Sequence, residues 1–217
     1  RGTQGGIPEP PGVKIPGSGP APVVSVRSDM TGRLPTTGAI AHDQASSVGS
    51  AMIVRRAGPE DLASLARIAQ QVAWEDYEGL LDEATISQAQ IDYYSPVALA
   101  RRMLEATILV AEHESEVAGF AIVQAEATRL RLAAVAVDPA SSPAETGDAL
   151  IVSARQLDPA AALYTDVLAG HRDVAAFYAE RGFVAGESVS GRLCGQAVVR
   201  RRWWLPPAAG FAMAGHG

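Results

Sequence analysis

Apolar and polar residues alternate between positions 52 and 205 in a way that predicts a domain of mixed helices and strands. Strand-like apolar runs occupy residues 53–56, 108–111, 117–123, 130–137, 162–167, 183–184 and 196–204. Apolar residues recur with helical spacing in 62–73, 96–106, 144–156 and 172–181. The order β-α-α-β-β-β-α-β-α-β-β predicts an α/β fold, with helices packed on a mixed (α+β) sheet.

The two expected N-terminal helices carry clear start signals and apolar faces. The first follows a turn at Gly58 with Pro59 in its first turn, and its apolar face holds Leu62, Leu65, Ile68, Val72 and Ala73. The second begins with Ser95 as N-cap and Pro96 as its first residue. Its inward-facing side chains are expected to be those of Leu99, Met103 and Leu104.

Residues 1–51 differ in composition from the patterned region. They hold seven of the 14 prolines and nine of the 21 glycines, but no aromatic residue. Such a segment buries too little apolar area to offset the entropy lost on ordering. We expect an extension that is disordered or bound to a partner, in which residues 22–26 could add a strand. The folded domain is expected at 52–205, followed by a flexible tail at 206–217.

Charge and cysteine content narrow the classes of function. The formal net charge of -6 argues against non-specific binding to nucleic acid or to an anionic membrane surface. No apolar run approaches the length of about 20 residues that a membrane-spanning helix needs. The single cysteine, Cys194, excludes an intramolecular disulfide, so a cytoplasmic location is expected. No histidine or acidic motif has metal-ligand spacing, and no metal is expected.

Three segments together resemble the GNAT acetyltransferase superfamily over roughly residues 52–204. The first is the strand at 53–57 with the helix start at 59–62, and the second is the hairpin formed by 109–112 and 117–120. The third is 171–183, which is similar to the family's last helix, usually Asn-x-x-Ala-x-x-Leu-Tyr followed by Gly-Phe. The resemblance lies in the order and spacing of the three segments.

The resemblance implies direct transfer of an acetyl group from acetyl-CoA to a primary amine of a small molecule or protein. Tyr178 matches the family tyrosine that protonates the departing CoA thiolate. A phenol suits this task because its ordinary pKa, about 10, keeps it protonated at neutral pH. Packing beside Phe177 is the structural alternative for Tyr178.

The resemblance also implies which residues bind CoA. The backbone of the strand at Val135 and Val137 would hold the pantetheine arm. His171, just ahead of the last helix where the family commonly has Asn, could contact the cofactor, cap the helix or be an exposed loop residue. The pyrophosphate would lie at a helix start. The matching positions there are Ser142, Ala144, Glu145, Thr146, Gly147 and Asp148.

The pyrophosphate segment departs from the family pattern Arg/Gln-x-x-Gly-x-Gly/Ala. Ser142 supplies no guanidinium, Pro143 has no backbone N–H, and Glu145 places a carboxylate where glycine is usual. If Glu145 turns outward, the amides of Thr146 to Asp148 would remain available. A binding or regulatory domain that has lost turnover is therefore the alternative function.

The general base and the acceptor site are less constrained by the pattern. Glu126 is the candidate base, with Asp166 and water as alternatives. Trp74 and Tyr77 are candidate substrate-binding residues, because they lie in the segment that the resemblance assigns to the acceptor wall, where aromatic faces suit a cationic amine. Trp203 and Trp204 would form a homodimer surface if their rings are exposed.

Overall fold

The computed structural model describes residues 52–208. Its elements, in chain order, are β1 (Ile53–Arg56), the 3-10 turn η1 (Pro59–Asp61), α1 (Leu62–Tyr77), α2 (Glu83–Ala89), the π-helical turn η2 (Gln90–Tyr94), α3 (Pro96–Glu105), β2 (Thr107–His113), β3 (Glu116–Ala125), β4 (Arg129–Val137), α4 (Pro143–Gln156), β5 (Ala162–Leu168), α5 (Arg172–Glu180), β6 (Val184–Leu193) and β7 (Gln196–Leu205).

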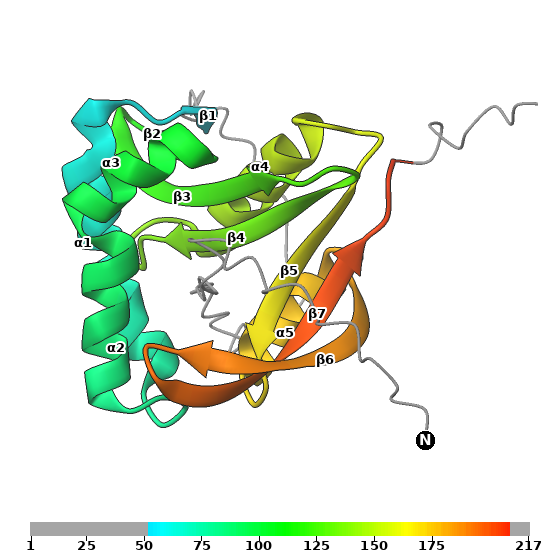
Figure 1. The fold of residues 1–217 in the computed structure, drawn as a ribbon. Coiled ribbons are helices and arrows are strands. Elements are labelled where there is room, and N and C mark those ends of the chain that lie inside the picture. The colour runs from blue at the N-terminus through cyan, green and yellow to red at the C-terminus, as the bar shows by residue number, and fades with distance from the viewer. Residues whose placement is uncertain (1–51, 209–217) are drawn as a thin grey trace, which may run out of the picture.

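The seven strands form one sheet in the order β1-β2-β3-β4-β5-β7-β6 (Figure 1). Every neighbouring pair is antiparallel except β4 and β5, which run parallel. The β2–β3 hairpin turns at Glu114 and Ser115, both with positive φ, as tight hairpin turns require. The α4 crossover joins the two parallel strands, because strands that run in the same direction cannot be joined by a tight turn.

Helices cover both faces of the sheet and divide the core in two. The α1–α3 layer packs on one face against side chains that include Ile108, Phe120 and Ile122. Helices α4 and α5 pack on the other face, against residues that include Leu132 and Leu163. In Figure 1 the α1–α3 layer lies at the left of the sheet and α5 lies behind β5 and β7.

The mixed α/β class predicted from the pattern is confirmed, with one additional short helix. Helix α1 continues through the aromatic and acidic stretch to Tyr77 and ends before Gly79, whose φ of +77° suits a turn. The chain then forms α2 and η2, which the pattern did not predict. Helix α2 has only seven residues, which is too short for a clear helical period.

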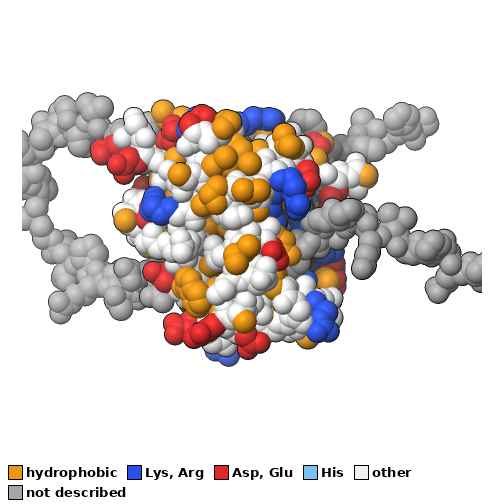
Figure 2. Space-filling view, turned by 60° about the vertical axis from the view of Figure 1, so that its left-hand side comes forward, with side chains coloured by type: hydrophobic (Ala, Val, Ile, Leu, Met, Phe, Trp, Pro, Cys, Tyr) orange, Lys and Arg blue, Asp and Glu red, His pale blue; other side chains and the backbone are white. Residues whose placement is uncertain are grey.

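The expected inward face of the second helix is partly wrong. Leu99 is fully buried, but Leu104 is 87% exposed. Leu104 follows Leu99 by five positions, and only positions three or four apart share a helix face. Val97 and Ile91 of the same layer are also exposed, and Figure 2, which turns this side toward the viewer, shows hydrophobic side chains gathered on it.

The two tryptophans near the end of β7 are not exposed as a homodimer surface would require. Trp203 packs against the α4–α5 side of the core, and the Trp204 ring lies 5.0 Å from that of Tyr164. Both side chains are half-buried.

Some of the expectations concern segments that the structure does not describe. Those for 1–51, including a strand at 22–26, and for 209–217 lie outside the described residues. Residues 206–208 have no regular secondary structure. No helix within 52–208 is long and apolar enough to span a membrane.

Candidate functional site

Strands β4 and β5 pair at one end and then diverge. Only Arg129–Arg131 pair with 162–164, after which β4 pairs with β3 alone and β5 with β7 alone. We call residues 132–137 of β4 and 165–168 of β5 the fork (Figure 1). Along the fork, the backbone edge of β4 that faces β5 has no strand partner among residues 52–208, and an edge of this kind is one with which an extended ligand pairs.

A bulge in β4 marks the start of the fork. Leu132 pairs with Val123 and Ala134 with Ile122, which leaves Ala133 as the extra residue. The bulge shifts the side-chain alternation, so that Leu132 and Val135 both face α4 and α5. The large apolar residues of β4 stand at 130, 132, 135 and 137, so the spacing of two is interrupted once, between 132 and 135. This interruption is a sequence signal of the bulge that the strand prediction did not use.

Val135 and Val137 lie along the fork with their side chains in the core. The whole residues, backbone included, are only 0% and 1% exposed, and their side chains are packed in the core and not available to a ligand. This arrangement is compatible with the backbone role that the resemblance implies for them.

Tyr178 lies on the α5 side of the fork, at its narrow end. Its side chain is 1% exposed and packs edge-on against Phe177 and Phe183, at ring centroid distances of 5.3 and 4.9 Å. Burial raises the pKa of Tyr178 above its usual value, while a hydrogen bond with Thr165 and the charge of Arg181 lower it by less. The phenol therefore keeps its proton at neutral pH, as a general acid must.

His171 occupies the N-cap position of α5, but its side chain does not cap the helix. Its ring contacts that of Tyr77 edge-on at 6.0 Å, and its Nε2 is buried without a hydrogen-bond partner among the described residues. Burial lowers the pKa of His171, although Asp173 opposes the shift. The structure thus brings a predicted cofactor residue and a predicted substrate residue together at the start of α5.

The amides expected to remain free at the start of α4 are not free. The helix already begins at Pro143, and the Thr146 amide donates to the Ser142 carbonyl at 3.0 Å. Gly147 and Asp148 lie further inside the helix, where amides are used by the helical ladder. Because Pro143 has no N–H, the first-turn amides without a hydrogen-bond partner among the described residues are those of Ala144 and Glu145.

Thr146 and Gly147 pack α4 against the sheet. Both are buried, and the Thr146 Cγ2 lies against Gly119 of β3. Asp148 instead pairs with Arg181 and so links α4 to the end of α5. These three residues therefore fix the position of α4 relative to the sheet and to α5, and they do not face a ligand site directly.

The start of α4 fits a phosphate group only in part. Ser142, Ala144 and Glu145 are exposed there, and the two free amides lie at the positive end of the helix dipole. Arg67 compensates the preceding Asp138 at 2.8 Å, but Glu145 forms no ion pair with any described residue. The uncompensated carboxylate opposes binding of an anion.

Both candidate bases are held by arginines and other donors. Glu126 accepts hydrogen bonds from Tyr164 at 2.6 Å and from Arg129 at 2.5 Å. Burial acts to raise its pKa, but these two donors outweigh burial and lower the pKa overall. Asp166 accepts from Arg202 at 2.8 Å. Glu126 is thus ionised at neutral pH but is a weak base.

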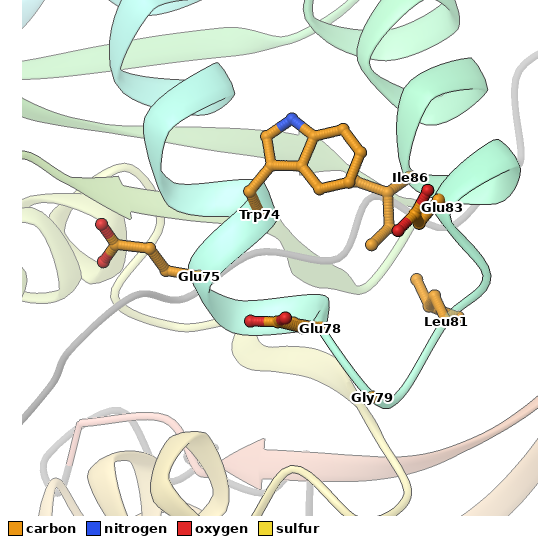
Figure 3. A pocket seen from close by; sticks show the side chains of 7 residues that line it. All are labelled: Trp74, Glu75, Glu78, Gly79, Leu81, Glu83 and Ile86. Atoms are coloured by element: carbon orange, nitrogen blue, oxygen red, sulfur yellow. The ribbon is translucent and has the colours of Figure 1, made fainter.

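A hollow of about 430 Å³ lies where α1 meets α2. Trp74 lines it and points toward Ile86 and Glu83, as Figure 3 shows. The remaining lining residues are Glu75, Glu78, Gly79 and Leu81. An indole with three carboxylates suits a cationic group. Tyr77 does not line the hollow and is only 4% exposed.

Metal ligands and the single thiol were the other candidates for chemistry. The described residues contain no group of three His, Cys, Asp or Glu side chains placed to hold a metal ion. Burial raises the pKa of Cys194, and Asp92 adds to the shift, so its thiol is a poor nucleophile at neutral pH.

Solved structures with the same architecture come from several organisms, while no protein-family model and no curated protein matches the sequence. The PaiA N-acetyltransferase of Thermoplasma acidophilum, solved with coenzyme A, is 19% identical with a TM-score of 0.61, over 70% of this chain and 98% of that one. A GCN5-related N-acetyltransferase of Rhodopseudomonas palustris is 21% identical with a TM-score of 0.60, over 72% and 96%. The ribosomal-protein-S18-alanine N-acetyltransferase of Escherichia coli is 19% identical with a TM-score of 0.54, over 77% and 98%.

Proposed function

We propose that this chain, which has the fold of the GCN5-related N-acetyltransferases, is an acyl-CoA-dependent N-acyltransferase. The reaction is direct transfer of acetyl from acetyl-CoA to a primary amine. The observation that carries the proposal is the fork, which combines a free backbone edge of β4 with the Tyr178 phenol at its narrow end.

In the proposed mechanism the residues of the fork bind and orient the donor. The backbone of Val135 and Val137 pairs with the pantetheine arm, and the amides of Ala144 and Glu145 face the pyrophosphate. His171 lies beside the arm as a neutral ring. The bulge at Ala133 directs a backbone amide differently from the regular ladder, and an amide aimed at the thioester oxygen would stabilise its developing charge.

The chemical step forms one C–N bond and breaks one C–S bond. The neutral acceptor nitrogen attacks the thioester carbon, and the CoA thiolate leaves with the proton of Tyr178. The Tyr178 phenolate then regains a proton from water. The positively charged nitrogen loses its proton to Glu126 or to water. The lowered pKa of Glu126 makes it a weaker base than an ordinary carboxylate, so a proton that it accepts passes on readily to water.

Trp74 is proposed to contact the acceptor side of the complex through the hollow that it lines. Its indole is 42% exposed and three glutamates share the hollow, so a positively charged part of an amine substrate would bind there. Tyr77 contributes indirectly, because its buried ring supports His171. The acceptor is a small-molecule amine or a protein amino group.

A second candidate is a domain that has kept the fold without turnover. Pro143 and Glu145 favour it, because one removes an amide and the other adds a carboxylate at the expected pyrophosphate position. This candidate predicts weak or absent binding of acetyl-CoA.

Calorimetric titration with acetyl-CoA tests the proposal, followed by detection of released CoA thiol with a panel of amines. We expect a Kd in the micromolar to millimolar range, which corresponds to about 4 to 8 kcal/mol. Thiol release should depend on an added amine. No binding at millimolar acetyl-CoA contradicts the enzyme function, and binding without thiol release for any amine favours the second candidate.

A further inference from the structure

Four arginines lie on the sheet face that α1–α3 cover or in the layer above it, and Arg102 is linked to Arg200 through Tyr93, whose phenol senses both charges. Arg131 lies on β4 at the narrow end of the fork, Arg200 and Arg202 lie on β7, and Arg102 comes from α3. Arg102 and Arg200 are only 9% and 7% exposed. Guanidinium groups are rarely this buried unless they are paired with an anion.

Within residues 52–208, fewer acidic side chains than arginines form ion pairs in this cluster. Asp166 serves Arg202 at 2.8 Å and Arg131 at 3.9 Å. Arg202 also reaches Glu187, which is exposed, at 3.1 Å. Neither Arg102 nor Arg200 forms an ion pair with a residue of the described chain.

Arg200 carries the strongest signal. Its Nε is buried and has no hydrogen-bond partner among residues 52–208. Burial lowers the pKa of Arg200, although Asp166 opposes the shift, so this side chain is held away from water without full compensation. A buried charge without a partner costs several kcal/mol, and a bound anion would remove that cost.

The fold positions Arg200 in advance of any ligand. On β7 it pairs in register with Leu168 of β5 and Val189 of β6. A Cβ added to Gly191 would lie 2.7 Å from the Arg200 Nη2, so the guanidinium lies against the bare backbone of β6. The guanidinium of Arg102 lies over the ring of Tyr93, with its Cζ 5.1 Å from the ring centroid, and this contact helps to orient it.

The side of the sheet indicates which substrate would carry the anion. Tyr178 and the α4 start, assigned above to the acyl donor, belong to the α4–α5 face, whereas the arginines face the α1–α3 layer. We propose that the acceptor amine carries a carboxylate and that Arg200, assisted by Arg102, binds it. Two N–H groups of a guanidinium match the two oxygens of a carboxylate. The inference rests on the proposed function, in which the acyl donor binds on the α4–α5 face and the acceptor on the α1–α3 face.

The test measures CoA release with a set of amino acids and their carboxamides, which differ in the carboxylate charge. We expect the acids to be preferred by about tenfold or more in kcat/KM. Arg200→Met should remove most of this preference without changing acetyl-CoA affinity, and Arg200→Lys should restore part of it. Arg201→Met, at the exposed neighbouring position, is the control and should behave as the wild type. Equal use of acids and amides, or an equal loss for both in Arg200→Met, would overturn the proposal.

A second measurement does not depend on turnover. N-acetylated amino acids, the products of the proposed reaction, should raise the melting temperature more than their amides at fixed ionic strength, and Arg200→Met should abolish the difference. If this holds while no amine releases CoA thiol, the anion site stands and the proposed function fails. If no acid stabilises more than its amide, the anion site is wrong. If succinyl-CoA is used in preference to acetyl-CoA, and Arg200→Met removes that preference, the anion belongs to the acyl group and the acceptor assignment is overturned.

Discussion

Tyr178 shows how burial suits a residue to one chemical role. A phenol surrounded by Phe177 and Phe183 cannot easily hold a negative charge, and its raised pKa reflects this. The same environment keeps the phenol protonated at neutral pH, and it makes the phenol a weaker acid than one in water. Its role as the acid is a prediction that removal of its hydroxyl group can test.

Removing the Tyr178 hydroxyl should separate catalysis from binding. We expect Tyr178→Phe to lower kcat by about tenfold to hundredfold, because proton donation to the leaving thiolate is lost. The Kd for acetyl-CoA, measured by calorimetry, should stay nearly unchanged. Thr165→Val, which removes only the hydrogen-bond partner, should have a smaller effect on kcat. Turnover that is unchanged in Tyr178→Phe would exclude it from the mechanism.

His171 should make stability depend on pH. Its pKa in the folded state lies below the ordinary value of about 6.5, so the unfolded chain takes up more protons as the pH falls. The stabilisation is therefore present above about pH 6.5 and is lost as the pH falls toward the folded-state pKa. Urea unfolding between about pH 7.5 and 5.5 should show this slope, and His171→Asn should reduce it.

The exposed His113 provides the matched control for this measurement. His113→Asn replaces an exposed histidine by the same residue and so controls for the loss of a histidine as such. An equal change in both variants would contradict the assignment to His171.

At the scale of elements, helix α4 combines close packing with an incomplete anion site. Its buried side meets Gly119 of β3 through Thr146, and its exposed first turn presents Glu145. One element thus holds the sheet together and leaves one carboxylate at the place where a phosphate would bind.

Gly119 should be needed for the approach of α4 to the sheet. A Cβ there would lie 2.8 Å from the Ala136 carbonyl oxygen and 2.9 Å from the Thr146 Cγ2. We expect Gly119→Ala to lower the free energy of unfolding by about 1 to 3 kcal/mol, measured with urea. Combining it with Thr146→Ala should cost less than the sum of the two single changes, since the Cγ2 contact is then absent. Strict additivity would show that the clash is relieved elsewhere.

Glu145 should weaken binding of CoA. Replacing the carboxylate in Glu145→Gln removes repulsion of the pyrophosphate and should lower the Kd about three- to tenfold, with a smaller gain at high salt. Glu105→Gln removes an exposed carboxylate of α3, on the other side of the sheet, and serves as the control. Unchanged affinity in Glu145→Gln would mean that the pyrophosphate does not lie at the start of α4.

At the scale of the whole molecule, the two faces of the sheet carry different chemical groups beside the fork. The α4–α5 face presents Tyr178, and the α1–α3 face presents Asp166 and Arg200. A donor and an acceptor that approach from opposite faces would meet between β4 and β5, because the two strands are not paired with each other along the fork.

Hydrogen exchange should reveal which part of the molecule responds to CoA. We expect added CoA to slow amide exchange in residues 132–137, 144–145 and 165–168, because a ligand in the fork covers these backbones. Strands β1 and β2 should change little, since they lie beyond β3. Protection confined to residues 74–86 would instead locate the ligand in the hollow beside Trp74.

The local pattern of the sequence was sufficient to predict the class of fold and most elements. Runs such as 130–137 and the spacing of Leu65, Ile68 and Val72 show a strand and a helix because burial repeats with the period of each. The seven-residue α2 was missed because it spans too few turns to show a period. The position of Tyr178 could be named because it lies in a short contiguous string.

The relations between distant residues were decided only by the tertiary structure. The contact of His171 with Tyr77, the clash-limited fit of Gly119 to Thr146, and the cluster around Arg200 join residues that are far apart along the chain. Burial, pKa and unpaired charge depend on which groups are close in space, and a linear pattern does not contain those distances. The sequence alone thus determined the elements and the likeness to a fold, whereas the structure decided which amides are free and which charges lack a partner.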